Sequence, residues 1–588
     1  MVNFQINYKS FLVILSFLFQ TYVSAQVFVG ANTNILVNNQ VFYVKQNLEL
    51  SVSSSNFYLR NQSQLLQGTT DTGTNKGLGS LSVFQEGTVN NYQFNYWCSP
   101  VGNIDSATSI NNPFGITQLG IPTTVTATTA ATMLTTYDGV ANPFGISTLW
   151  INKFTAANKS YSDWTRVGSA TTINAGEGFT MKGTSGTDTT TIEGVQNNSG
   201  GAQRYDFRGK PNDGTINIPV ILDEFTLTGN PYPSAISLQA FLIGETNCDG
   251  TAYFWEQDKT VNSHFLTDYS GGYATYSATL DIYTPAIFYS YNGSGNQISP
   301  ITSPGNMYHR KYAPIGQGFM IVGSANANVQ MKNKYRVYVK EGALHASQFE
   351  KRANDKTITK SDSTSQIRFN TLLDNGPISQ MVLAFNPSST DGVDRAMDAT
   401  SPNDGPANNY FVINNKEYVI QVVPFDIDKK ISIGFRNSSK ANYKITVNEM
   451  QNISEVNNVY IHDITADLYY DIKNSIFDLT LPTGTNNTQY EITFKNGTLG
   501  LSDIINQRSF IIRQDNSIKK LIISNPLQKE IDSCSLYDVV GRLIFTRSKL
   551  GTDSDILFST SNLSDGIYFV KLSTANKSEM GIKIIVKN

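Results

Sequence analysis

Short alternating runs separated by turn residues extend along most of the chain, and they constrain the fold more than any other feature. In residues 34–52, "NILVNNQVFYVKQNLELSV", apolar and polar residues alternate, and "NN" and "QN" mark the breaks. A period of two turns one face of a strand toward a core, while Asn, Gly and Ser favour the turns between strands. We therefore expect residues 26–87 to form a meander of short strands, and the whole chain to be all-β.

Composition agrees with this expectation and excludes two classes of partner. Tyr and Phe number 30 and 32, and 588 residues exceed what a single core can bury, which predicts several domains. Lys and Arg total 44 against 47 Asp and Glu, a formal net charge of −3. Such a balance predicts neither a nucleic-acid groove nor a membrane-surface patch.

The first residues have the pattern of a secretory signal peptide. Lys9 precedes an apolar run over residues 11–19, and "VSAQ" supplies the small residues of a cleavage site between Ala25 and Gln26. The run is too short to cross about 30 Å of hydrocarbon, and no longer apolar run follows. We expect residues 1–25 to be removed and the mature chain to have no transmembrane segment.

Two segments farther along resemble each other. "INAGEGFTMKG" at residues 173–183 and "APIGQGFMIVG" at residues 313–323 share Gly-x-Gly-Phe followed four residues later by Gly. A tryptophan lies upstream of each, at Trp150 and Trp255. The pattern predicts an internal duplication in which these two tryptophans occupy equivalent positions.

A polar, aperiodic stretch, "FEKRANDKTITKSDSTSQ", separates this pair from a further series of strand-like runs. The sequence therefore predicts several β-sandwich-like domains in tandem, ending in a small immunoglobulin-like (Ig-like) unit. The expected divisions are a signal peptide (1–25), a first β module (26–200), a second, related β module (201–348), a linker (349–366), a β-sandwich (367–500), a linker (501–517) and the terminal unit (518–588).

The terminal unit shows its strands most clearly. In "SLYDVVGRLIF" Gly541 lies between apolar runs, and in "LSDGIYFVKLS" Gly566 precedes another, so we expect both glycines at positive φ in turns. Tyr568 is expected on the inward face of its strand, and Lys583 and Lys587 on the outward face of the last strand. About 70 residues in this pattern predict an Ig-like sandwich.

This unit resembles the type A C-terminal sorting domain of the type IX secretion system. The resemblance is carried, in order, by Asn525-Pro526, "YDVVGR" with Gly541 and Arg542, "LSDGIY" with Gly566 and Tyr568, and Lys583 and Lys587 in the last strand. Ser524 stands where the family often has Pro. The resemblance implies that the type IX machinery is a partner, and that the chain passes through the periplasm to the outer cell surface or the medium. The alternative is an ordinary terminal adhesion module.

No motif in the sequence identifies a reaction. The zinc-binding H-E-x-x-H and the serine-hydrolase G-x-S-x-G patterns are absent, and the four histidines, His264, His309, His345 and His462, have no ligand spacing. Cys98 lies in an apolar context that favours an inert thiol, and three widely spaced cysteines allow one disulfide at most. We therefore predict no catalytic residue, no metal ligand and no cofactor.

One acidic segment has two interpretations. "TDGVDRAMDATSPNDG" places four carboxylates in a turn-rich stretch, at Asp391, Asp394, Asp398 and Asp404. Such loops bind Ca²⁺, although the spacing is not that of an EF-hand. The simpler interpretation is a solvated loop in which Asp side chains cap turns.

Taken together, these features favour a secreted or cell-surface β-protein without catalytic activity that binds an extracellular glycan or another surface component. The four tryptophans, Trp97, Trp150, Trp164 and Trp255, either present ring faces to sugars or lie buried in sandwich cores. Two alternatives stay open: an extracellular hydrolase of polysaccharide or protein, and a structural coat component.

Overall fold

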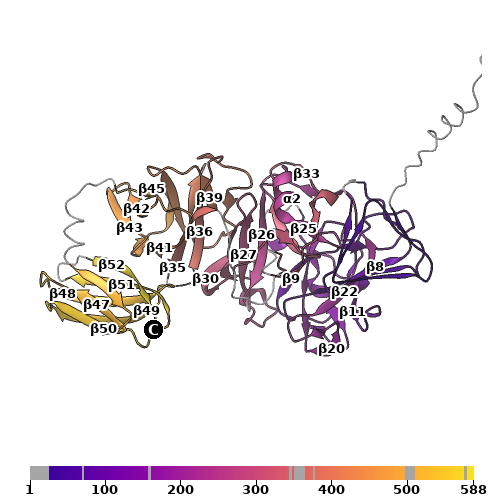
Figure 1. Cartoon of the computed structure of the whole chain (residues 1–588), viewed down its shortest axis with the longest axis horizontal. Helices are drawn as coiled ribbons and strands as arrows, with labels where there is room; N and C mark the ends of the chain where they lie inside the picture. The colour runs from indigo at the N-terminus through magenta and orange to yellow at the C-terminus, as the bar shows by residue number, and fades with distance from the viewer. Residues whose placement is uncertain are drawn as a thin grey trace, which may run out of the picture.

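The regular secondary structure of the computed structural model is almost entirely β-strand, and the prediction of an all-β chain is confirmed. Figure 1 shows the units following one another along the long axis, with the earliest strands (indigo) at one end and the terminal unit (yellow) at the other. The structure describes residues 26–68, 72–155, 161–342, 347–349, 364–374, 376, 378–496, 510–574 and 579–588. The expected signal peptide lies outside these residues, and Gln26 is exposed.

The described residues between Val27 and Glu86 form a parallel β-solenoid, so the prediction of a meander is wrong. Successive strands stack in parallel on three faces: β1 (Val27–Val29) on β4 (Leu48–Leu50) and β7 (Lys76–Gly77); β2 (Asn34–Asn38) on β5 (Asn56–Arg60) and β8 (Ser80–Glu86); and β3 (Val41–Val44) on β6 (Gln64–Gln67). Alternation is the same in parallel and antiparallel strands that have one buried face, so the sequence pattern could not separate the two.

Stacked polar side chains and left-handed corners support the solenoid. Asn56 donates to the Oδ1 atom of Asn34 at 3.1 Å, and Ser80 donates to the Oδ1 atom of Asn56 at 3.1 Å, one turn of the solenoid to the next. Asn39 and Asn61 have φ of 58° and 50° at corners, a conformation that asparagine tolerates better than most residues. Asn39, in the pair that marks a break in the sequence, and Asn61, one solenoid turn later, therefore lie at corners.

The first unit continues beyond the predicted boundary at residue 200. Strand β22 (Arg204–Pro211) pairs antiparallel with β8 and with β11 (Leu119–Pro122), which joins it to the solenoid sheet. Trp97 lies 1 % exposed in the core of this unit, so the prediction of a buried tryptophan holds for that residue. The division into modules remains a proposal.

The second unit is built around a sheet whose members run in the order β24, β32, β26, β27, β29 and β30. Their bounds are β24 (Phe225–Gly229), β32 (Gly318–Val322), β26 (Thr251–Gln257), β27 (Ser270–Ser277), β29 (Ile287–Tyr291) and β30 (Gln297–Pro304). The short helix α2 (Leu238–Gly244) packs its apolar face into the same core, and the Ser237 side chain caps its first turn.

The two Gly-x-Gly-Phe segments occupy matching strand registers. In the first unit β18 (Gly178–Lys182) pairs with β9 (Phe94–Cys98), with Gly178 opposite Cys98. In the second unit β32 pairs with β24, with Gly318 opposite Gly229. The matching registers support the predicted duplication, which itself stays a prediction.

Trp150 and Trp255, the tryptophans upstream of these two segments, do not lie in matching elements. Trp150 ends the 3₁₀ turn η2 (Thr148–Trp150), whereas Trp255 lies inside strand β26. The prediction that they occupy equivalent positions is wrong, because the segments before the shared signature differ in secondary structure.

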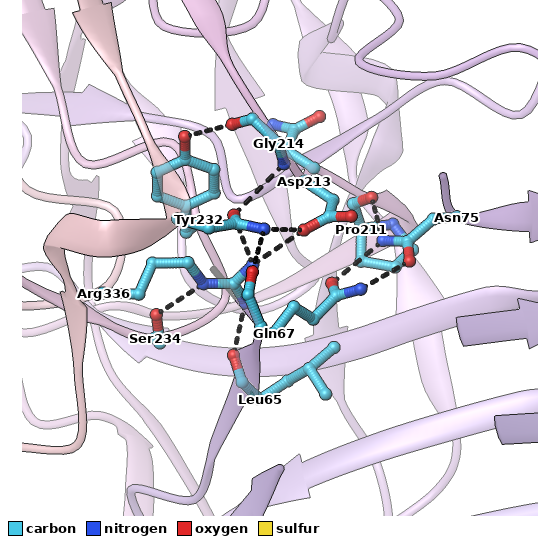
Figure 2. Close-up of polar contacts among 12 residues, drawn as sticks. Leu65, Gln67, Asn75, Pro211, Asp213, Gly214, Tyr232, Ser234 and Arg336 are labelled. Atoms are coloured by element: carbon cyan, nitrogen blue, oxygen red, sulfur yellow. Dashed lines mark hydrogen bonds and ion pairs between the residues drawn. The ribbon is translucent and has the colours of Figure 1, made fainter. Parts of the chain in front are cut away.

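A buried polar cluster joins the first and second units (Figure 2). Arg336, in β34 (Arg336–Val337), forms an ion pair with Asp213 at 3.2 Å, and both side chains are at most 3 % exposed. Arg336 also donates to the carbonyl oxygen of Leu65 in the solenoid and to Ser234. Because two buried charges neutralise each other here, this cluster holds the solenoid against the second unit.

The third unit is built on one large sheet with a main core, and a second, smaller apolar cluster joins the sheet to Ile282 of the second unit. Among the described residues its order is β43 (Leu468–Asp471), β42 (Tyr460–Asp463), β45 (Gly484–Thr493), β40 (Lys430–Asn437), β38 (Ala407–Ile413), β39 (Lys416–Val423), β36 (Ile378–Phe385), β35 (Ser365–Leu373), β41 (Ala441–Gln451) and β44 (Phe477–Leu481). The β36–β39 pair is parallel, so the sheet is mixed rather than purely antiparallel.

The two expected linkers meet the described structure only at their ends. Phe349, the first residue of the expected 349–366 linker, is 1 % exposed and packs on Trp97 with ring centroids 4.7 Å apart. Residues 350–363 and 497–509 lie outside the described residues. Strand β46 (Ile511–Asp515) falls within the expected 501–517 linker, so strand structure begins earlier than predicted.

The terminal unit is a two-sheet sandwich with its own core, as an Ig-like unit requires. One sheet has the order β46, β47 (Lys520–Ser524), β50 (Asp555–Ser559), and the other β49 (Leu543–Gly551), β48 (Ile531–Asp538), β51 (Gly566–Thr574), β52 (Glu579–Val586).

Candidate ligand-binding site

An aromatic cavity of about 520 Å³ lies where the first, second and third units meet. Strands β9, β26 and β27 contribute rings to its wall, and Pro402 and Asp404 of the third unit also line it. Its rings include Phe94, Tyr96, Trp150, Trp164, Trp255 and Tyr273. Three of the four tryptophans of the chain therefore line one cavity, which is of the size that small ligands occupy.

Ring-to-ring contacts fix the central part of this wall. Trp255 stacks parallel to Tyr96 with centroids 6.5 Å apart, and it meets Tyr273 edge-on at 5.2 Å. The Tyr96 and Tyr273 hydroxyls lie 2.8 Å apart. Trp164 packs against Tyr96 at 5.8 Å and against Phe154 at 4.9 Å. Trp164 and Trp255 are only partly buried, so part of each ring remains available to a ligand.

The Lys182 side chain lies against the ring face of Trp150. The Lys182 Nζ atom lies 3.9 Å from the centre of the Trp150 ring and 4.8 Å from that of Phe94. The indole N–H of Trp150 donates to the carbonyl oxygen of Tyr137 at 2.7 Å. When it is protonated, the amine is attracted by the ring's quadrupole, so the charged form of Lys182 favours this orientation of Trp150.

Lys182 also contacts two polar side chains of the cavity lining, Tyr269 and His264, and His264 continues this chain to Asp138 outside the lining. The Lys182 Nζ atom donates to the Tyr269 hydroxyl at 2.7 Å and contacts His264 Nδ1 at 3.1 Å, while His264 Nε2 lies 2.8 Å from an Asp138 carboxylate oxygen. The His264 ring stacks on Trp150 at 5.2 Å. Burial lowers the pKa of Lys182 from 10.5 to about 7, against the opposing effect of Asp138.

Besides its tyrosines, the described lining holds two ionisable side chains, Asp404 and His264. Asp404 is its one carboxylate, and no Lys or Arg belongs to it. Asn152, Thr180 and Gln297 add neutral hydrogen-bonding groups. The described part of the cavity therefore combines apolar ring faces with hydrogen-bonding side chains and one negative charge.

Gly541 and Arg542, both predicted for sorting, lie in the hairpin between β48 and β49. Gly541 has φ +75°, as predicted. The Asp538 carboxylate accepts from the backbone N–H groups of Val540 and Arg542 at 3.0 and 2.9 Å, and it pairs with the largely exposed Arg542 guanidinium at 3.0 Å. Asp538 thus organises a turn that presents Arg542 to solvent.

Asn525 and Pro526 form a second turn of the terminal unit. Asn525 is fully buried; its side chain donates to the Lys529 carbonyl oxygen at 2.8 Å and accepts from the Lys529 N–H at 2.9 Å. Pro526 is exposed. The asparagine therefore closes the loop and leaves the proline on the surface.

Gly566 does not have the predicted conformation. It is the first residue of β51, opposite Val586, and it is not among the glycines with positive φ. Tyr568 is buried as expected, and its hydroxyl donates to the Ser564 carbonyl oxygen at 3.0 Å. That bond, rather than a left-handed glycine, ties the strand to the preceding turn. Whether any of these residues is read during sorting stays a prediction.

The two lysines of the last strand differ in exposure. Lys587 is exposed, whereas Lys583 is half-buried opposite Phe569 in the β51–β52 pair. Both remain candidates for the sorting signal.

The cysteines and the acidic segment show no reactive arrangement. Cys98, Cys248 and Cys534 are buried free thiols, and burial raises the pKa of each. Among the described residues no His, Cys, Asp and Glu side chains gather as a metal site would require.

The four carboxylates of the acidic segment point to different partners. Asp391 pairs with a lysine, Asp394 and Asp398 accept backbone N–H groups, and Asp404 borders the aromatic cavity. The contacts of Asp394 and Asp398 are those of turn-capping side chains.

Sequence reasoning named the tryptophans but missed their convergence. The wall joins positions about 300 residues apart, from Phe94 to Asp404, and no local spacing signals that they meet. The odd clustering of aromatic residues in "FNYW" and "AYFW" was the available hint.

Comparison with known families gives two matches. Residues 516–587 match the secretion system C-terminal sorting domain, which confirms the resemblance of the terminal unit. Residues 10–494 match a domain of unknown function, DUF8693. Comparison with curated proteins finds no match.

Solved structures share little with the whole chain. A DUF3244 family protein from Bacteroides vulgatus with an immunoglobulin-like β-sandwich fold is 11 % identical over 13 % of this chain and 85 % of that chain, with a TM-score of 0.12. A polysaccharide lyase is 9 % identical over 38 % of this chain and 40 % of that chain, with a TM-score of 0.15. A Pseudomonas aeruginosa CupB2 chaperone is 10 % identical over 38 % of this chain and 87 % of that chain, with a TM-score of 0.11. Likenesses this low carry no argument about activity.

The terminal match establishes the route of the protein, and the larger match its family. The sorting domain makes the type IX secretion machinery a partner and places the protein at the cell surface or in the medium. In the described part of the chain, no helix has the length and apolarity that a membrane crossing needs. The protein is a member of the DUF8693 family that carries a type IX C-terminal sorting domain.

Proposed function

We propose that this exported protein binds an extracellular glycan in the aromatic cavity and does not transform it. One observation carries the proposal: Trp150, Trp164 and Trp255 line a single cavity of about 520 Å³. The apolar C–H faces of sugars pack on aromatic rings, and their hydroxyl groups need hydrogen-bond partners such as Asn152 and Gln297.

The geometry favours binding over hydrolysis. A glycosidase needs two carboxyl groups, about 5 to 10 Å apart, on either side of the scissile bond. Asp404 is the one carboxylate among the described residues that line the cavity. Glu177, in the first Gly-x-Gly-Phe segment, is occupied by Lys153 at 2.9 Å.

A glycan array with the mature chain from Gln26 onward tests the proposal, followed by titration of the hits with tryptophan fluorescence. We expect binding that changes the emission, and a loss of about tenfold in affinity for Trp255→Ala, because one ring face is worth roughly 1 kcal/mol or more. Trp255→Phe keeps a ring and should bind close to the parent protein. Tyr43, 61 % exposed on the solenoid, gives the control Tyr43→Ala, which should bind normally.

Two results would contradict the proposal. In one, no glycan is retained on the array. In the other, Trp255→Ala binds every hit as tightly as the parent protein does.

A further inference from the structure

We infer that the aromatic cavity takes an uncharged oligosaccharide and discriminates against one that carries carboxylate or sulfate groups. This inference rests on the proposed glycan-binding function and adds the class of glycan. Its evidence is the electrostatic character of the cavity wall.

The ring faces themselves disfavour anions. An aromatic ring has a negative face and a positive edge, so its face attracts C–H groups and cations and repels carboxylates. Trp164 and Trp255, together with Tyr96, give the described wall many such surfaces. An uncharged pyranose can lie on them without an electrostatic penalty.

Asp404 adds a formal negative charge. It lies in the loop between β37 (Ala399–Thr400) and β38, its side chain is exposed, and it makes no hydrogen bond or ion pair with any described residue. A carboxylate only accepts hydrogen bonds, which suits sugar hydroxyl donors. An anionic group on the sugar would face this like charge. The described lining holds no Lys or Arg, and its histidine, His264, is paired with Asp138 through Nε2.

Lys182 does not supply a positive charge to the ligand. Its side chain is buried, and its Nζ atom is engaged by the Tyr269 hydroxyl, by His264 and by the Trp150 ring. It does not reach the cavity surface. His264 is in turn directed at Asp138 through Nε2.

Size and polarity favour a sugar over a small organic cation, which aromatic rings and a carboxylate also attract. The cavity holds about 520 Å³, and a quaternary ammonium group fills a small part of such a volume. Asn152, Thr180 and Gln297 provide neutral partners for several hydroxyl groups, which an ammonium group lacks.

The test compares two ligands of equal length: an uncharged trisaccharide found on the array, and the same trisaccharide with each hydroxymethyl group oxidised to a carboxylate. Both are titrated against the mature chain at neutral pH and low salt, with tryptophan fluorescence as the readout. We expect the oxidised sugar to bind at least tenfold more weakly, and the gap to narrow as salt is added.

Asp404→Asn removes the charge and keeps the shape, so it should reduce the discrimination at least threefold. The control is Asp223→Asn, which removes an exposed carboxylate that pairs with Lys416 and lies outside the cavity lining. This control should discriminate as the parent protein does.

The outcomes separate the inference from the function on which it rests. Equal or tighter binding of the oxidised sugar overturns the inference and leaves glycan binding intact. Unchanged discrimination in Asp404→Asn overturns the role of that residue. Failure of every saccharide, or tighter binding of choline than of any sugar, overturns the proposed function together with the inference.

Discussion

Lys182 gives a quantitative test of the cavity wall, because its environment favours the neutral amine. The side chain is 4 % exposed, and burial lowers its pKa from 10.5 to about 7. Between these two values the unfolded chain holds a proton that the folded chain has released. The free energy of unfolding therefore rises with pH in this window, by up to about 1.4 kcal/mol for each pH unit. Below about pH 7 both states are protonated, and the full cost of burying the charge is present.

Substituting Lys182 by Met removes this titration and keeps the side chain long and apolar. We expect the variant to have a higher free energy of unfolding than the parent protein at about pH 6.5. By about pH 9 the difference between the two proteins should have fallen by roughly 2 to 3 kcal/mol, because the parent protein is stabilised as the pH rises. The assay is urea denaturation at several pH values, followed by tryptophan fluorescence. The difference between the two proteins cancels the other titrating groups.

The control Lys416→Met removes an exposed lysine that pairs with Asp223. It should follow the pH dependence of the parent protein. Parallel stability curves for Lys182→Met and the parent protein between about pH 6.5 and pH 9, within about 0.5 kcal/mol, would refute the reasoning.

Three further outcomes are expected. Asp213→Asn leaves Arg336 charged and buried, so it should lower the free energy of unfolding, measured by thermal denaturation, by roughly 3 to 5 kcal/mol. The double variant Asp213→Asn with Arg336→Met should recover part of that loss. No recovery in the double variant would contradict the pairing of the two side chains. Gly541→Val should lower the free energy of unfolding by about 1 to 3 kcal/mol and reduce the amount of protein outside the cell, because φ is +75° and a new Cβ would lie 2.5 Å from a Leu372 methyl carbon. Gly566→Val should leave export near normal. Equal effects of the two substitutions in cell fractionation would contradict this expectation. Deleting residues 516–588 should leave the chain folded but held in the periplasm, and normal extracellular amounts of the truncated chain would contradict a sorting role.

The sequence predicted the strand content and the terminal unit, because both depend on local signals. Alternation over a few residues identifies a strand, and Asp538 close to Gly541 identifies a turn. Gly566 shows the limit of this reasoning. Asp565 and Gly566 form an Asp-Gly pair, which also signals a turn, yet the strand begins at the glycine and the turn precedes it.

The solenoid and the cavity depended on information that is not local. The step from Asn34 to Asn56 is 22 residues, and alternation within each strand does not say whether the next strand stacks in parallel or returns antiparallel. Likewise, Trp97 and Trp255 look alike in sequence, each beside other aromatic residues. One lies in the first core, and the other meets rings from distant strands at a junction of units.

Because the cavity lies where three units meet, a single unit would not carry the whole site even if it folded alone. The described wall takes rings from the first and second units and its carboxylate from the third. Contacts across these boundaries hold the parts in register: Arg336 donates to Leu65 across the first boundary, and across the second the Tyr253 hydroxyl lies 2.7 Å from that of Thr400. A fragment that stops at residue 348 keeps most of the rings and loses Asp404. On the proposed electrostatic argument, we expect such a fragment to bind sugars with less discrimination against acidic ones, because the rings remain and the carboxylate of the third unit is lost.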